Sequence, residues 1–172
     1  MRVIASVQSK RGSSRGLIHY LAHSKIDPDR ESVSGRELFN EFTEHLTVRS
    51  ANNFLKSNCG KGRPPNADLH HLVLSFRQTD FLQIGSTDEE RKRRIKIVTR
   101  HAIGKLEDRL QSERLAWAGA VHLNTANPHV HIAIQKQYLT RDVQSKSLSK
   151  IPREALPHFE LIEGEKQIGD GI

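Results

Sequence analysis

The sequence predicts an α+β protein of the broad α/β class: a ferredoxin-like sandwich whose antiparallel sheet carries helices on one face and leaves the other face open. Two patterns support this fold. Residues 115–122 and 129–135 are strand-like runs joined by a turn-rich segment, which predicts a hairpin. A long helical pattern over residues 88–110 precedes the hairpin and follows a buried strand, an order typical of a split β-α-β unit.

Hydrophobic spacing predicts the elements of the first third of the chain. Residues 1–9 alternate as a strand with apolar side chains on both faces, so we expect it inside the sheet. Ser13 or Ser14 can cap the helix that follows. Helical spacing then predicts a helix over residues 35–46 and a second helical stretch over residues 48–55.

The middle of the chain supplies the strand and the long helix. Residues 69–76 form a nearly continuous apolar run, which is typical of a buried central strand. Thr-Asp-Glu-Glu at residues 87–90 is a capping box, and apolar residues recur at helical spacing from Ile95 to Leu110. Residues 56–66 are rich in glycine, proline and basic side chains, and we expect a loop there.

Composition limits the class of protein. The 27 Lys and Arg residues outnumber the 20 Asp and Glu residues, and a formal charge of +7 favours a polyanionic partner. The single cysteine, Cys59, excludes an intrachain disulfide framework and a thiolate metal cage. With neither a membrane-length apolar run nor a signal-peptide pattern, we expect a cytoplasmic protein with no membrane partner.

The length of 172 residues corresponds to about one domain. We expect residues 1–158 to form it. Residues 159–172 are glycine-rich and acidic, and we expect a C-terminal tail at which a longer protein was truncated.

Three histidines lie close together in the predicted hairpin. Apolar and other residues alternate over residues 129–135, so His129 and His131 share the face opposite the apolar one. His122 ends the preceding strand and can face both of them. A single histidine on a strand is usually an ordinary polar residue, but three that converge by strand parity predict a metal site with open coordination positions.

The chain has two tyrosines, Tyr20 in the predicted first helix and Tyr138 just beyond the histidine strand. A half-buried helical tyrosine commonly anchors a core. Beside a metal site, a phenolic oxygen can instead attack a phosphodiester and keep the phosphate in a phosphotyrosine, provided that a cation polarises the phosphate.

Three segments together resemble the motifs of one family. V-H-L-N-T-A-N-P-H-V-H-I-A-I-Q-K at residues 121–136 resembles the third motif of conjugative and mobilisation relaxases, in the HUH endonuclease superfamily. H-L-V-L-S-F-R at residues 71–77 resembles the strand before the family's long helix, and H-Y-L-A-H at residues 19–23 its tyrosine motif. Residues 1 to about 158 therefore resemble a tyrosine relaxase domain of the MobP and VirD-like type.

The resemblance implies a site- and strand-specific DNA relaxase for the conjugation of a plasmid or mobile element. It would nick single-stranded or hairpin DNA at an origin of transfer and form a 5′-phosphotyrosine, with relaxosome accessory proteins as partners. By position, Tyr20 would be the nucleophile, and His122, His129 and His131 would bind Mg²⁺ or Mn²⁺. On ligand chemistry alone, three imidazoles favour Mn²⁺ or another transition ion.

The third motif departs from the family pattern. Family members often carry aspartate at the position of Asn124 and sometimes another near Ala126, and asparagine cannot act as a base. We therefore consider His23, on the same helix as Tyr20, and Asn124 as candidate helpers. Basic residues near the predicted turns and rim are candidate DNA contacts: Lys10, Arg11, Arg15, Lys61, Arg63, Lys136 and Arg141.

Two other functions stay open on the sequence. An HUH replication initiator or transposase would use the same chemistry, although such proteins commonly place the tyrosine after the histidine motif. A module that binds single-stranded or hairpin DNA without cleaving it would account for Asn124 and Ala126. Its binding would weaken steeply with salt, and no covalent adduct would form with any divalent metal.

Overall fold

The computed structural model describes residues 2–8, 14–29, 31–57, 69–148, 151 and 159–160. Along these residues the elements are β1 (Arg2–Gln8), α1 (Ser14–His23), β2 (Leu38–Phe39), α2 (Val48–Ser57), β3 (Leu69–Phe76), α3 (Gln78–Gln83), α4 (Asp88–Leu110), β4 (Ser112–Arg114), β5 (Trp117–His122), β6 (His129–Gln135), β7 (Gln137–Thr140), β8 (Ser145–Ser147) and β9 (Phe159–Glu160). None of the helices in these ranges has the length and apolar content needed to span a membrane.

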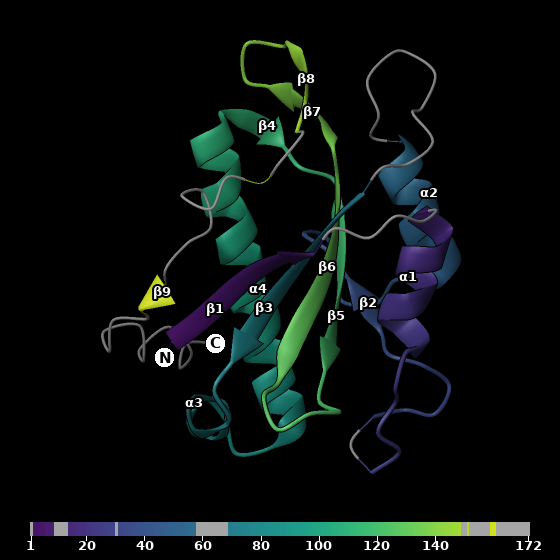
Figure 1. Ribbon diagram of the computed structural model, residues 1–172, viewed down its shortest axis with the longest axis vertical. Coiled ribbons are helices and arrows are strands. Elements are labelled where there is room, and N and C mark those ends of the chain that lie inside the picture. Colours follow the sequence, from purple (N-terminus) through teal and green to yellow (C-terminus); the bar gives the residue numbers. More distant parts are fainter. Residues whose placement is uncertain are drawn as a thin grey trace, which may run out of the picture.

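A six-stranded sheet forms the centre of the fold, in the order β2-β5-β6-β3-β1-β9, and every neighbouring pair is antiparallel (Figure 1). The predicted antiparallel α+β architecture is therefore confirmed. A smaller sheet, β4-β7-β8, lies beyond the end of β6 and at the top of the view. Neither α3 nor this small sheet was predicted from the sequence.

One face of the large sheet packs against α4 and forms the larger hydrophobic core. Val130, Ile132 and Ile134 of β6 and Trp117 of β5 supply the sheet side of this core. From α4 it is completed by apolar residues at helical spacing, Ile95, Ala102, Ile103 and Leu106. The apolar residues that alternate along β6 thus pack against those at helical spacing on α4.

The opposite face is also covered, by α1 and α2, which corrects the expectation that the helices would share one face. In Figure 1 these two helices lie on the other side of the sheet from α4. The sheet contributes only small side chains there, Ala116, Ala118, Ala120 and Ala133. These small side chains let the two helices pack closely on the sheet, so the candidate site is confined to one end of this face.

The long helix begins and ends as its sequence predicts. The Thr87 hydroxyl accepts a hydrogen bond from the Glu90 backbone N–H, and the Glu90 carboxylate accepts one from Ser86 N–H. At the other end, Gln111 adopts a left-handed conformation and its N–H bonds back to the last turn. α4 is therefore capped at both ends and packs against the hairpin strands.

Residues 35–46, predicted as a helix, form the edge strand β2 and a turn. Leu38 packs into the α1–α2 core, whereas its neighbour Phe39 packs into the α4 core. Adjacent side chains that point to opposite layers require a strand, and β2 pairs with Ala120 and Gly119 of β5. The apolar spacing that suggested a helix arises from packing on two layers.

β1 has one open face, contrary to the expectation that it would be covered on both sides. Ile4 is 55% exposed, whereas Ala5, which points to the other face, packs against the α4 core. β1 pairs with β3 on one edge and with the two-residue β9 on the other. Phe159–Glu160 thus pairs with the first strand, while residues 161–172 of the predicted tail lie outside the described residues.

Candidate metal and nucleophile site

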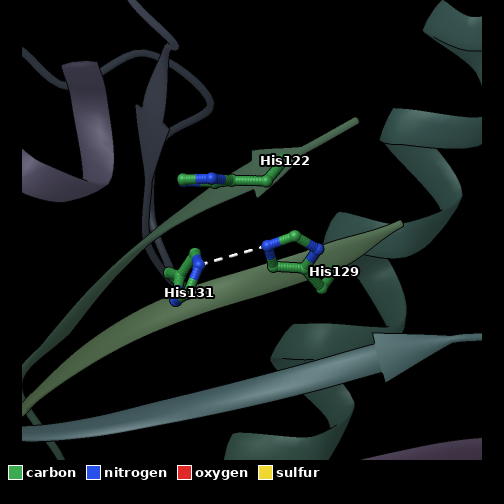
Figure 2. Close-up of side chains that lie close together, drawn as sticks. All are labelled: His122, His129 and His131. Carbon is green, nitrogen blue, oxygen red and sulfur yellow. Dashed lines mark hydrogen bonds between the residues drawn. The ribbon is translucent and has the colours of Figure 1, made fainter. Parts of the chain in front are cut away.

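The three hairpin histidines converge at the turn end of β5 and β6. His122 and His129 are direct cross-strand partners, and His131 faces Ala120 two positions further along the hairpin. One ring nitrogen from each of the three lies within 4.8 Å of the others (Figure 2). Among the described residues, this is the group of His, Cys, Asp or Glu side chains with a geometry that could hold a metal ion.

Backbone carbonyls orient two of these rings. The Nε2 of His122 is 2.9 Å from the carbonyl oxygen of Leu21 in α1, and the Nδ1 of His129 is 3.0 Å from that of Asn127. Because a carbonyl oxygen can only accept, the ring nitrogen must carry the proton in each contact. A neutral ring then keeps an electron pair on Nδ1 of His122 and on Nε2 of His129, as a metal ligand requires.

A fourth histidine orients the third ring. The Nδ1 of His131 is 2.7 Å from Nε2 of His71, a fully buried residue of β3, while its Nε2 is 3.1 Å from Nε2 of His129. Sequence reasoning missed this role of His71. Strand parity within β3 could not have found it alone, because the β3–β6 register, which puts His71 on the same face as His131, is known only from the structure.

The ring of Tyr20 lies against this cluster. Tyr20 is half-buried on α1, and its ring centroid is 5.6 Å from that of His131 and 6.1 Å from that of His71, edge-on in both cases. Tyr138, on β7, packs instead against the α4 core. Of the two tyrosines, the structure thus brings Tyr20 to the histidines.

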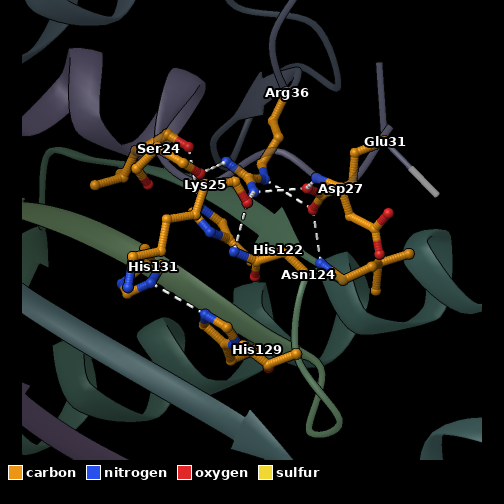
Figure 3. A network of polar contacts seen from close by, with 12 residues as sticks. Ser24, Lys25, Asp27, Glu31, Arg36, His122, Asn124, His129 and His131 are labelled. Atoms are coloured by element: carbon orange, nitrogen blue, oxygen red, sulfur yellow. Dashed lines mark hydrogen bonds and ion pairs between the residues drawn. The ribbon is translucent and has the colours of Figure 1, made fainter. Parts of the chain in front are cut away.

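A buried ion pair ties α1 to the histidine hairpin, and sequence reasoning missed it as well (Figure 3). Arg36 donates two hydrogen bonds to the carboxylate of Glu31, at 2.8 and 2.6 Å, and further ones to the carbonyls of Ser24 and Lys25 just after α1. Glu31 also accepts from the backbone N–H of Leu123, next to His122, at 2.7 Å. The connection between α1 and β2 is thereby joined to the hairpin.

The environment of the site disfavours protonation of His122 and His129. Burial, followed by the nearby charges of Arg36 and His129, lowers the pKa of His122 to about 3. Burial also lowers the pKa of His129, more strongly than its bond to Asn127 raises it. A metal ligand must be deprotonated, so both rings are ready to bind a cation at neutral pH.

The two predicted helpers have identifiable contacts. Asn124 donates from its amide to the carbonyl of Lys25 at 2.6 Å, which fastens the hairpin turn to the end of α1. His23 is exposed, its ring is 4.6 Å from that of His19, and it lies against Gly35. Their participation in the chemistry stays a prediction.

The predicted DNA contacts fall into two groups. Lys10, Arg11, Lys61 and Arg63, and the side chain of Arg15, lie outside the described residues. Two more lie beyond the far end of β6: Lys136 directly follows the strand, and Arg141 is exposed and ion-paired with Asp108 at 2.5 Å. His129 and Lys136 are seven residues apart along an extended strand, so about 23 Å separate them. Lys136 and Arg141 could therefore contact only DNA that lies far from the histidines.

A family model describes most of the chain. The model of MobL relaxases matches residues 7–159, which include Tyr20, His71 and the three hairpin histidines. The chain belongs to the MobL relaxase family. The resemblance to conjugative and mobilisation relaxases is thereby confirmed, while the MobP and VirD-like subtype stays a prediction.

A solved structure adds support for the fold of this MobL relaxase. The conjugative relaxase TrwC, in a metal-bound complex with oriT DNA, matches with a TM-score of 0.52 at 13% identity, over 84% of this chain and 60% of that chain. The metal-free TrwC complex matches over the same shares at 13% identity with a TM-score of 0.49. The MobL relaxase chain thus spans about 60% of the length of these structures. No curated protein sequence matches significantly.

Proposed function

We propose that this chain is a DNA relaxase that nicks single-stranded origin-of-transfer DNA by transesterification on Tyr20, in plasmid or mobile-element conjugation. The observation that carries the proposal is the position of Tyr20, whose ring is 5.6 Å from that of His131 although the two residues come from different elements. Membership of the MobL relaxase family supports the same activity. The TrwC structure named above contains oriT DNA, which agrees with the proposed substrate.

In the proposed reaction, the Tyr20 phenolic oxygen attacks the phosphorus of the scissile phosphodiester. A bond forms between that oxygen and phosphorus, the bond from phosphorus to the 3′ oxygen breaks, and the DNA 5′ phosphate stays on Tyr20. The phenol loses its proton, and the departing 3′ oxygen gains one. The phosphotyrosine keeps a phosphodiester bond, so the released 3′ hydroxyl can reverse the step and rejoin the strand.

His122, His129 and His131 would hold the divalent ion in this proposal. These side chains suit a cation. One ring nitrogen of His122 and of His129 donates to a backbone carbonyl, so the other nitrogen keeps its electron pair. Burial also disfavours the protonation of both rings. When bound, the ion would withdraw charge from a non-bridging phosphate oxygen. We propose Mg²⁺ or Mn²⁺, and the all-imidazole set favours Mn²⁺ in vitro.

A covalent-adduct assay tests the nucleophile. Protein is incubated with Mn²⁺ and a pool of single-stranded oligonucleotides tiled over the replicon that encodes it, and adducts that survive denaturation are separated by gel electrophoresis. Wild type should form an adduct that EDTA prevents. Tyr20→Phe should abolish it, whereas Tyr138→Phe, which alters the other tyrosine of the chain, should leave it intact.

The two alternative functions give other outcomes in the same assay. Loss of the adduct in Tyr138→Phe, but not in Tyr20→Phe, would indicate the chemistry of a replication initiator or transposase. Salt-sensitive DNA binding without an adduct under Mg²⁺ or Mn²⁺ would indicate a binding module that does not cleave.

We further propose that the protein acts in the cytoplasm with relaxosome accessory proteins.

A further inference from the structure

The fourth histidine of the site, His71, contacts the ring of His131 on the nitrogen opposite Nε2. It is fully buried, its Nε2 is 2.7 Å from Nδ1 of His131, and its ring is 6.1 Å from that of Tyr20. It projects from β3, whereas the three predicted ligands come from β5 and β6. His71 on β3 therefore lies beside both the proposed ligand His131 and the proposed nucleophile Tyr20.

The direction of the hydrogen bond between His131 and His71 is fixed when His131 binds a cation through Nε2. A neutral imidazole that gives its Nε2 electron pair to a metal must carry its proton on Nδ1. The Nδ1–H of His131 then donates to Nε2 of His71, which must be present as the Nδ1–H tautomer to accept. Partners of this kind fix the orientation and tautomer of a ligand, and they are usually carboxylates, carbonyls or waters.

Backbone carbonyls at 2.9 and 3.0 Å serve in that role for His122 and His129, whereas His131 contacts the His71 side chain at 2.7 Å. From this geometry we propose that His71 is a positioning residue for the metal site: it accepts the Nδ1 proton of His131 and holds its Nε2 toward His122 and His129. The inference rests on the proposed metal site.

The adjacent residue offers a matched control. His70 is also a buried histidine of β3, but strand parity directs it to the other face, where its Nε2 contacts the Leu148 carbonyl at 2.5 Å. A substitution at either position removes the same side chain from the same strand. Only the substitution at His71 should change the metal site.

Metal affinity is the measurement. Mn²⁺ is titrated calorimetrically into wild type, His71→Leu, His71→Gln and His70→Leu, with thermal unfolding recorded for each variant. Gln places an amide oxygen near the position of Nε2 and can still accept a hydrogen bond. His71→Leu should weaken Mn²⁺ binding by about tenfold to hundredfold. His71→Gln should recover most of that loss, and His70→Leu should bind Mn²⁺ within about twofold of wild type, even if both positions lower the melting temperature.

The outcomes separate the inference from the proposed function. If wild type binds Mn²⁺ and His129→Ala abolishes binding, but His71→Leu binds as tightly as wild type, the inference is wrong and the proposed site stands. If wild type binds no divalent ion at the triad, the proposed metal site and this inference both fail. Nitrogen-15 histidine spectra of the Zn²⁺-loaded protein provide a second readout: the His131 proton should reside on Nδ1, and its presence on Nε2 would overturn the inference.

Discussion

At the residue scale, the Glu31–Arg36 pair explains how the two halves of the site are held together. The Glu31 carboxylate accepts two hydrogen bonds from the Arg36 guanidinium and one each from the backbone N–H groups of Asp27 and Leu123. Both side chains are buried. Removing one member of such a pair leaves an uncompensated charge in the interior, which costs far more than an exposed pair contributes.

We therefore expect Glu31→Gln to lower the free energy of unfolding by about 3–5 kcal/mol at pH 7. The control is Glu37→Gln, which alters a carboxylate that is 62% exposed and pairs with His45; its effect should stay within about 0.5 kcal/mol. Chemical denaturation measures both. An equal effect of the two substitutions would contradict the role assigned to the buried pair.

The same carboxylate makes stability depend on acid pH. Burial opposes ionisation of Glu31, but the hydrogen bonds from Arg36, Asp27 and Leu123 prevail and lower its pKa in the folded protein. Since the unfolded value is about 4.3, the stabilisation is complete above that pH and is lost as the pH falls through the lower folded value. Wild type should lose unfolding free energy from about pH 5 downward, and Glu31→Gln should lose less over that range; parallel profiles would refute this account.

Sequence reasoning found the histidines of the hairpin because strand parity is a local property. His122, His129 and His131 lie within one supersecondary unit, so their convergence follows from a period of two and a short turn. His71 and Glu31 required knowledge of pairing between distant segments: Glu31 meets Leu123, which is 92 residues away, and a periodicity cannot predict that contact.

At the element scale, the alanine face of β5 and β6 sets the position of α1. Ala118 and Ala120 are fully buried beneath the α1–α2 layer, and His122 bonds to the carbonyl of Leu21 on α1. The distance between the Tyr20 helix and the sheet therefore depends on the small size of these side chains.

Elements with a regular period, β3, α4 and the hairpin, were predicted correctly. β2 was missed because its apolar residues pack into two different layers.

Enlarging one alanine should displace Tyr20, the proposed nucleophile, without removing the three histidines proposed to bind the metal. We expect Ala118→Leu to lower the unfolding free energy by about 1–3 kcal/mol and to reduce the rate of adduct formation, because overpacking shifts α1. The control is Ala102→Leu, at a buried alanine of α4 on the other face of the sheet. It should lower the unfolding free energy by a similar amount and leave the rate of adduct formation by the folded protein nearly unchanged. An equal loss of rate in both variants would contradict the claim that the alanine face sets the position of α1.

At the scale of the whole molecule, the site occupies one end of the large sheet, and the β4-β7-β8 sheet lies at the opposite end (Figure 1). The chain has a formal charge of +7. Under the proposed function, a single strand at Tyr20 should also contact basic residues outside the site. The 56–66 segment supplies two candidates, Lys61 and Arg63.

Single-stranded DNA binding should weaken steeply as salt increases, because each neutralised phosphate releases a counterion. If Lys61 and Arg63 each contact a phosphate, replacing either with Ala should reduce the slope of log affinity against log salt by about 0.7. Lys105→Ala, at an exposed lysine of α4, is the matched control and should leave the slope unchanged. Fluorescence anisotropy with a labelled oligonucleotide measures the slopes; unchanged slopes in all three variants would remove Lys61 and Arg63 from the interface.

The central claim is that Tyr20 becomes covalently linked to DNA. After reaction with Mn²⁺ and single-stranded DNA, the adduct is digested with nuclease and protease, and the modified peptide is sequenced by mass spectrometry. The account predicts a nucleotide phosphate on Tyr20, in the peptide from α1 that also contains His19 and His23. A nucleotide on Tyr138 or on any other residue would contradict it.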